Sequence, residues 1–388
     1  MQKKVIALAV AGLVSGAAFA QSNVTIYGVA DATFEQAKAT GAVAATGNRG
    51  SFSRVNTNSS LIGFKGSESL GNGLNAIFQF ESGVAFDSAG GALAGGRDSF
   101  VGLQSANMGT VKLGLQTGPT RLLGAMVDMN AGATGPGANS SIIGKAGGTS
   151  ATGANTGSNF GFFDTRLSNS ISYTSPSFSG FTVAGAYSAG ENKSLDQAAA
   201  NSVINTSAYD LGATYNNGPI MVGLTYGKLN QRLDATNTNT AGTATMDSSR
   251  IYRLAGSYTF NGGHKIAALY EQTKNDYDRA SVSTELKRKV YGISGKFMVT
   301  PQGGLIAQYY HAANASGNFL ATNDSTGANL YEIGYEHSLS KRTMLKASWS
   351  KMSNKSNAVY DFGVGAVGGS WTAGADPQVF AAGIRHVF

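Results

Sequence analysis

The sequence predicts an all-β protein, a 16-stranded antiparallel transmembrane β-barrel. Three observations carry this prediction: apolar and polar residues alternate along the whole chain, the alternating segments are about ten residues long, and the connections between them alternate in length. No segment after residue 20 has 18 consecutive apolar residues, so helices that span a membrane are excluded.

The first twenty residues have the pattern of a cleaved signal peptide. Lys3 and Lys4 are followed by the apolar stretch Val5–Val14 and by Ala18-Phe19-Ala20, a small-residue cleavage site. A soluble N-terminal helix is the alternative. We expect residues 1–20 to be removed and residues 21–388 to form the barrel domain.

Composition supports a secreted β-protein. The chain has no cysteine, 53 glycines, 6 prolines and only 13% charged residues. Without Lys3 and Lys4, 27 basic residues face 22 acidic ones, a formal charge of +5. These basic residues are spread along the chain, which indicates no nucleic-acid partner.

Alternation is clearest near the C-terminal end. In Tyr331–Glu336 large apolar side chains share one parity and carboxylates the other, and Leu345–Ser350 repeats the pattern with a lysine. Successive side chains of a strand point to opposite faces, so each segment has one apolar and one polar face. A soluble β-sandwich would also alternate, so strand number and connections must decide. We predict strands at 24–34, 59–67, 73–83, 97–105, 110–117, 167–175, 180–189, 207–216, 219–230, 248–260, 264–275, 287–299, 303–312, 328–338, 343–353 and 378–388.

The connections between these segments fall into two groups. Short ones rich in Gly and Asn, which supply the positive φ of tight hairpins, lie at 70–73, 106–109, 216–219, 261–263 and 301–303. Long polar ones lie at 35–58, 118–166, 231–247 and 354–377. Short periplasmic turns opposite long external loops are typical of outer-membrane barrels and not of sandwiches.

The last predicted strand carries apolar residues on one parity up to the final residue. Ile384, His386 and Phe388 share that parity, and we expect them to act as a C-terminal assembly signal. In lipid every backbone group needs a partner, so this strand is expected to pair with the first one.

Four segments resemble the general porins of β-proteobacteria. They are Val24–Gly28, Ile62–Glu68 running into Leu70–Leu74, Ser168–Tyr173 and Gly383–Phe388. The resemblance implies a homotrimer in the cell outer membrane whose third external loop folds into the pore as a constriction. It also implies a water-filled channel for passive diffusion of small hydrophilic solutes and ions, with no cofactor.

Charged residues fall on the predicted lumen parity. The basic ones are Lys65, Arg97, Lys112, Arg166, Arg253, Lys265, Lys296, Lys346 and Arg385, and the acidic ones are Asp31, Glu81, Asp210, Glu271, Glu332 and Glu336. A charge on the lipid face would be unfavourable, which explains the sorting. Nine basic against six acidic positions predict a mild preference for anions.

The connection 118–166 is the expected constriction loop, and it carries Arg121 and Asp128. Arg97 and Arg166 match wall arginines of the porin pattern, and Glu81 matches an acid nearby. We expect these residues, with Lys65 and Lys112, to line the pore. Leu61 departs from the pattern, because relatives often have arginine before Gly63-Phe64-Lys65-Gly66.

Other functions find little support in the sequence. The chain has four histidines but no G-x-S-x-G nucleophile elbow and no HExxH zinc motif, so we expect no enzyme, although some outer-membrane barrels are hydrolases. A secreted adhesin and a substrate-specific channel of the same fold are the remaining alternatives. Sequence does not separate the specific channel from the general one.

Overall fold

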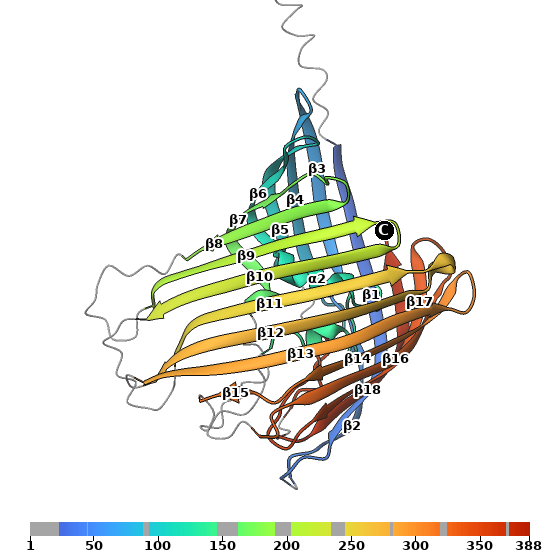
Figure 1. Ribbon diagram of the computed structural model, residues 1–388. Helices are drawn as coiled ribbons and strands as arrows, with labels where there is room; N and C mark the ends of the chain where they lie inside the picture. Colours follow the sequence, from blue (N-terminus) through green and yellow to red (C-terminus); the bar gives the residue numbers. More distant parts are fainter. Residues whose placement is uncertain are drawn as a thin grey trace, which may run out of the picture.

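The computed structural model describes residues 23–44, 46–87, 93–145, 162–190, 203–233, 245–279, 282–318, 324–369 and 372–388. The predicted signal peptide, residues 1–20, lies outside the described residues. Within them the chain is almost entirely β-structure (Figure 1).

Sixteen strands of the described chain form one closed antiparallel ring, as predicted. Each of the sixteen predicted segments coincides with one of these strands. They are β1 (Asn23–Thr40), β3 (Leu61–Gly71), β4 (Leu74–Val84), β5 (Leu93–Ser105), β6 (Gly109–Thr117), β7 (Arg166–Thr174), β8 (Phe181–Ala189), β9 (Val203–Asn217), β10 (Ile220–Leu233), β11 (Thr245–Thr259), β12 (Lys265–Arg279), β13 (Val282–Met298), β14 (Gly303–Ala312), β16 (Ala328–Ser338), β17 (Thr343–Asn354) and β18 (Asp376–Val387).

The ring closes between the first strand and the last. β18 pairs with β1 over Val29–Thr40, while the first part of β1 pairs with β3. The terminal Phe388 exchanges two backbone hydrogen bonds of 3.0 Å with Gly28. The predicted pairing of the two ends is confirmed, and this closure removes the sheet edge.

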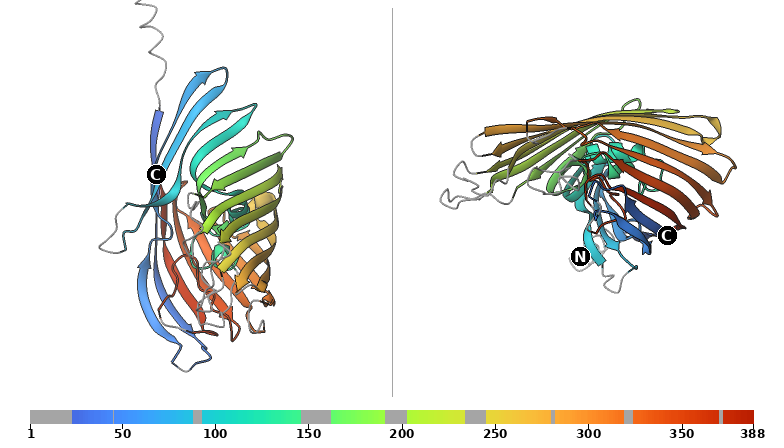
Figure 2. Two further views of the ribbon diagram at one scale, coloured as in Figure 1. Left: turned by 90° about the vertical axis from the view of Figure 1, so that its left-hand side faces the viewer. Right: turned by 90° about the horizontal axis from the view of Figure 1, so that it is seen from below.

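Connections of the two lengths emerge at opposite ends of the barrel (Figures 1 and 2). At the short-turn end Asn72 and Gly73 have φ values of 52° and 74°, which a tight hairpin requires. A 3₁₀ turn, η3 (Asn261–Gly263), makes another of these short links. At the other end β17 and β18 are joined by the long connection 355–375.

The segment 35–58, predicted as a loop, is largely β-structure. β1 continues to Thr40, and an additional strand, β2 (Arg49–Asn56), pairs with its second half. Alanines 37 and 39 are fully buried while Gln36 and Lys38 are exposed, so the alternation persists with small residues that a search for large apolar ones overlooks. The positive φ of Asn58 and Ser59 separates β2 from β3. A two-residue strand, β15 (Ser316–Gly317), also went unpredicted.

Burial in this barrel is inverted relative to a soluble protein. Outward apolar side chains are exposed, for example Ile293 at 64% and Phe297 at 59%, whereas inward polar side chains such as Glu271 are buried. Aromatic residues at the short-turn end also point outward, including Phe178, Phe181 and Phe260. This pattern fits a surface covered by lipid with an aromatic girdle.

The apolar core lies inside the ring, where the connection after β6 packs against the wall. This connection forms helix α2 (Pro119–Met126) and the 3₁₀ turns η1 (Asn139–Ser141) and η2 (Phe162–Asp164). Viewed along the barrel, its helical segments lie within the ring (Figure 2). None of the helices in the described ranges is long and apolar enough to cross a membrane.

Candidate functional site: the pore constriction

Residues 118–145, here called the inner loop, enter the barrel directly after β6. Pro119 occupies the first turn of α2, where a missing N–H costs nothing. The Asp210 carboxylate of β9 accepts hydrogen bonds from the Thr120 hydroxyl at 2.6 Å and from its backbone N–H at 3.1 Å. Leu123, on the next turn, packs over Gly223 of β10. The sequence expectation of an inward-folded loop agrees with these contacts.

A buried ion pair holds the two ends of the inner loop against β11 and β12. Arg253 is fully buried and its Nε donates to Glu271 at 2.7 Å. The same guanidinium donates to the Thr120 carbonyl at 2.6 Å and to Asp164 at 3.1 Å, and Glu271 accepts the Gly144 N–H at 2.6 Å. Arg253 and Glu271 therefore neutralise each other and fasten both ends of the inner loop to the wall.

Asp128 takes a different role from the predicted one. It was expected to line the pore, but it is only 8% exposed and is buried where the inner loop packs against Gln308 of β14. Its carboxylate accepts backbone hydrogen bonds from Asn130 at 2.8 Å and Asn139 at 2.6 Å, and one from the side chain of Gln308. Burial raises the pKa of the Asp128 carboxyl, although these hydrogen bonds oppose the rise. Asp128 folds the loop back on itself.

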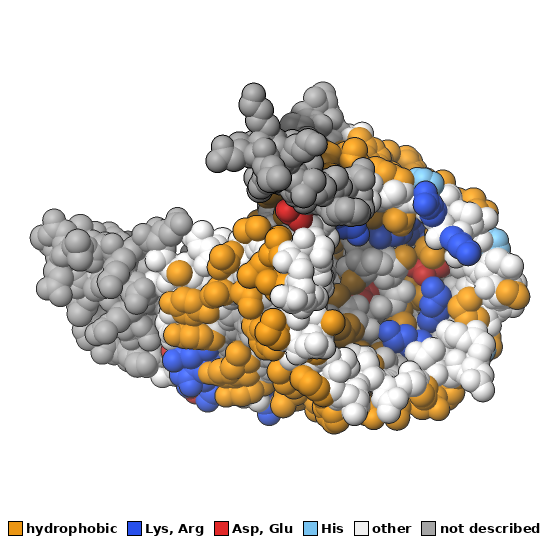
Figure 3. Space-filling view, turned by 90° about the horizontal axis from the view of Figure 1, so that it is seen from above, with side chains coloured by type: hydrophobic (Ala, Val, Ile, Leu, Met, Phe, Trp, Pro, Cys, Tyr) orange, Lys and Arg blue, Asp and Glu red, His pale blue; other side chains and the backbone are white. Residues whose placement is uncertain are grey.

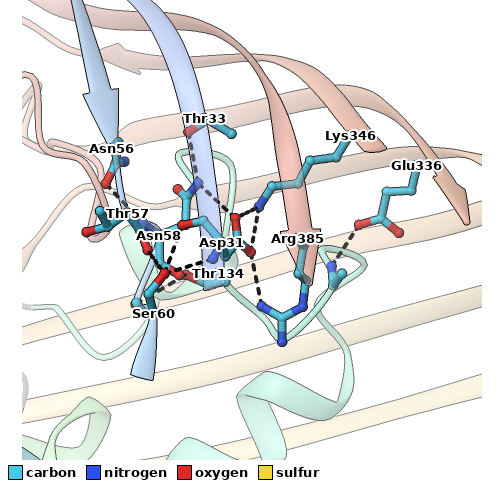
Figure 4. A network of polar contacts seen from close by, with 12 residues as sticks. Asp31, Thr33, Asn56, Thr57, Asn58, Ser60, Thr134, Glu336, Lys346 and Arg385 are labelled. Atoms are coloured by element: carbon cyan, nitrogen blue, oxygen red, sulfur yellow. Dashed lines mark hydrogen bonds and ion pairs between the residues drawn. The ribbon is translucent and has the colours of Figure 1, made fainter. Parts of the chain in front are cut away.

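The tip of the inner loop contacts the wall on both sides of the closure between β18 and β1. The Ala131 N–H donates to Glu336 at 2.8 Å, and the Thr134 hydroxyl donates to the Asn58 carbonyl at 2.9 Å, at the break between β2 and β3. Figure 4 shows the network around this contact, in which Asp31 lies between Lys346, at 2.6 Å, and Arg385, at 3.0 Å. Lys296 pairs with Glu336 at 2.7 Å.

A second connection packs on the inner loop from the long-loop end. The Gly363 N–H donates to the Ser141 hydroxyl at 2.9 Å, and Tyr360 and Phe362 join the apolar core. Burial raises the pKa of the Tyr360 phenol. The wall formed by β9–β18 and β1 is thus covered by two loops, and its inward cations Arg253, Lys296, Lys346 and Arg385 have carboxylate partners; we call it the covered wall.

The wall formed by β3–β7, which we call the open wall, retains charged side chains that face the lumen. Arg97 Nε lies 3.3 Å from a Glu81 oxygen, and the Tyr27 hydroxyl donates to Glu81 at 2.8 Å. Arg166 on β7 pairs with Asp98 on β5. Figure 3, seen from above Figure 1, shows a hollow in the barrel with Lys and Arg side chains around it.

Arg121 extends this group from the inner loop. It is half-buried on α2 and donates to the Asp164 carbonyl. Burial, followed by the positive charge of Arg166, lowers the pKa of the Arg121 guanidinium, and Arg97 acts in the same direction. The three arginines therefore lie close enough to interact although they come from β5, β7 and α2.

Lys65 and Lys112 complete the open wall. Among the described residues neither has a carboxylate within 4.0 Å. The Lys65 ammonium lies 4.8 Å from the centre of the Tyr27 ring, and that of Lys112 lies 4.6 Å from the centre of the Phe100 ring. Aromatic faces hold the two cations without neutralising them.

Comparison with known proteins identifies the family. The model of the Gram-negative porin family matches residues 7–358. The chain belongs to this family. Outer membrane porin protein 32 of Delftia acidovorans is 32% identical, with all of both chains covered, and an outer membrane porin protein of Bordetella pertussis is 31% identical over 91% of this chain and 95% of its own. A solved structure, the anion-selective porin from Comamonas acidovorans, matches with a TM-score of 0.72 and 27% identity, covering 95% of this chain and all of its own.

This porin is therefore an outer-membrane channel protein with a 16-stranded barrel. Sequence reasoning missed two acids of its lumen, Asp98 and Asp164. The register of β4 and β5 shifts between the pairs Phe80–Ser99 and Ser82–Gly96, and this irregularity lets Arg97 and Asp98 both reach lumen partners. Strict alternation assigns adjacent residues to opposite faces, so the pattern of the sequence offered no signal for the pair.

The porin's wall cations also differ from the simple count made on the sequence. Arg253, Lys296, Lys346 and Arg385 all have carboxylate partners, and Lys265 donates to the Met126 carbonyl at 2.8 Å. The count of nine basic and six acidic positions therefore does not describe the charge that a solute meets. The relevant group is smaller and lies on the open wall and α2.

Proposed function

We propose that this porin forms a general, water-filled pore in which small hydrophilic solutes diffuse passively and anions are mildly preferred. One observation carries the preference: five cations, Lys65, Arg97, Lys112, Arg121 and Arg166, face three carboxylates, Glu81, Asp98 and Asp164, beside the lumen. The solved relative described as anion-selective supports it.

The physical basis is a local positive potential in the lumen between the open wall and α2. Low-dielectric walls concentrate the field of the five cations, which raises the local concentration of anions. The three carboxylates and the shared hydrogen bonds keep each arginine in place and weaken its hold on any one anion. An ion must leave as readily as it enters, so partial neutralisation favours a general pore over a tight binding site.

The remaining proposals concern processing and assembly. We assign residues 1–20 to a cleaved signal peptide, residues 21–388 to the barrel, and Ile384, His386 and Phe388 to a C-terminal assembly signal. A homotrimer is proposed from the family resemblance. A catalytic role is not part of the proposal, because the matching family is described as one of porins.

The test is single-channel conductance with a salt-gradient reversal potential, after residues 21–388 are refolded and inserted in planar bilayers. We expect large, long-lived steps, often in threes, and a small potential on the anion side. Conductance that saturates as the concentration of one class of solute rises would favour a substrate-specific channel of the same fold. An absence of steps from protein shown to be folded and inserted would contradict the proposed function.

A further inference from the structure

The outer face of the barrel carries a belt of tyrosines at the long-loop end of β8–β16. Three cross-strand pairs contact each other, Tyr187 with Tyr209, Tyr226 with Tyr252 and Tyr309 with Tyr331, with ring centres 5.1, 5.0 and 5.2 Å apart. The second pair is displaced by two residues from the first and the third by four from the second, which follows the tilt of the strands. Tyrosines in such a belt lie at the level of the lipid headgroups.

Directly beyond this belt, β10–β13 present a row of outward cations. Lys228, Arg250, Lys274 and Lys287 are consecutive partners in the strand register, so they lie side by side across four strands. Lys289 follows on the same face of β13. Two carboxylates, Asp276 and Glu285, lie among the five cations and pair with Arg250, Lys274 and Lys287. Lys228 and Lys289 have no such partner among the described residues.

On the membrane side of the belt, the same strands form an apolar groove with a volume of about 820 Å³. Small residues at outward positions, Gly256, Ala268, Gly295 and Ala307, hollow the surface between Ile266 and Ile293. No residue of the described inner loop lines it. The groove therefore opens toward lipid and not toward the pore.

Groove and cations have a fixed spacing. Val222, Gly256, Ala268 and Ile293 are consecutive register partners, and on every strand the cation lies six residues further toward the long-loop end. Six residues of strand span about 20 Å, which is close to the length of an extended acyl chain. An amphiphile with a hydrocarbon chain in the groove would place its headgroup among the cations.

We propose that this face binds one phosphorylated glycolipid of the outer leaflet, with an acyl chain in the groove and phosphate groups between Lys228, Arg250, Lys274, Lys287 and Lys289. Five cations against two carboxylates suit an anionic headgroup and not a neutral one. The open wall provides a contrast, because outward positions of β3–β7 such as Phe64, Val101 and Ile171 are apolar and the described ones include no lysine or arginine.

The test uses refolded residues 21–388 in detergent and native mass spectrometry with two probes, bisphosphorylated lipid A and its dephosphorylated form. The headgroup variant is Lys228→Gln with Lys289→Gln, and the groove variant is Ala268→Phe. The matched control, Lys341→Gln with Arg342→Gln, removes two charges from the short turn between β16 and β17, at the other end of the barrel. Single-channel conductance verifies that each variant is folded.

We expect the wild type and the control to bind the bisphosphorylated lipid about tenfold more tightly than the dephosphorylated one, and the headgroup variant to lose that difference. The groove variant should bind both lipids more weakly. Equal binding of the two lipids by the wild type, which needs no variant, would overturn the proposal. An equal loss of lipid affinity in the control variant would also overturn it, as would displacement of the lipid by inorganic phosphate alone. So would a headgroup variant that changes its oligomeric state while its lipid affinity stays the same.

Discussion

The covered wall and the open wall of this barrel contain the same kinds of charged residue and use them differently. On the covered wall Arg253 and Glu271 are fully buried, paired and beneath the inner loop. On the open wall the side chains of Arg97 and Arg166 remain 20% and 16% exposed, and Lys65 and Lys112 have no carboxylate partner among the described residues. The difference teaches that a lumen charge holds the fold together when it is fully buried with a partner, and meets the solute when it is exposed or has no carboxylate partner.

The energetics of the two walls follow from this difference. A buried ion pair adds little net stability, because desolvation offsets its attraction, but removal of one partner leaves an uncompensated buried charge. A charge beside water is screened and contributes little to folding, yet its field still acts on ions that pass. Mutations on the covered wall should therefore change stability, and those on the open wall should change selectivity.

The largest expected effect is on the covered wall. Glu271→Gln leaves the Arg253 guanidinium with only Asp164 as an anionic partner, and we expect the free energy of unfolding to fall by about 3 kcal/mol. The urea midpoint of the refolded protein in detergent measures this loss. Glu81→Gln, the same substitution on the open wall, is the matched control. A comparable loss in both variants would remove the distinction between the walls.

The pH dependence of the inner loop provides a second test. Burial lowers the pKa of Lys145 to about 8, while the charges of Asp164 and Asp361 oppose this shift. Between about pH 8 and its ordinary pKa of 10.5, Lys145 binds a proton in the unfolded chain but not in the folded one, so stability rises with pH across this window. Relative to Lys145→Met, the free energy of unfolding of the wild type should rise by up to about 3 kcal/mol between about pH 8 and pH 10.5. Unfolding curves with parallel pH profiles for the two proteins would refute this account of Lys145.

A smaller effect is expected from a charge added to the open wall. Leu61 lies on the same inward parity as Lys65, near the start of β3, where it is half-buried opposite Val29 and Gly83. Leu61→Arg should shift the reversal potential modestly further to the anion side, because it adds a cation next to the lumen. Val29→Leu at the neighbouring position controls for a change in volume. A shift toward cations would show that this position does not face the ion path.

The sequence predicted the barrel well because its signals are local. Alternation in segments such as Tyr331–Glu336 follows from the geometry of one strand, and turn residues such as Asn72 and Gly73 determine one hairpin each. The continuation of β1 to Thr40 was missed for a local reason as well, since Ala37 and Ala39 hide the alternation. These features need no knowledge of what lies across the barrel.

The site was harder to predict because it depends on contacts between distant segments. Asp128 is buried only because Asn139, 11 residues further along the same loop, and Gln308 of β14 donate to it. Asp98 faces the lumen through a register shift that no periodicity records. The pairing of Asp31 with both Lys346 and Arg385 requires the closed ring, so a count of charges by parity overestimates the cations that a solute meets.

One measurement tests the central claim most directly: the salt-gradient reversal potential of two double variants with the same change in net charge. Arg97→Gln with Arg166→Gln removes two cations from the open wall, and Arg253→Gln with Lys346→Gln removes two from the covered wall. We predict that the first pair abolishes the anion-side potential and that the second pair leaves it at the wild-type value while lowering stability. Equal shifts in the two variants, or an unchanged potential in the first, would contradict the account.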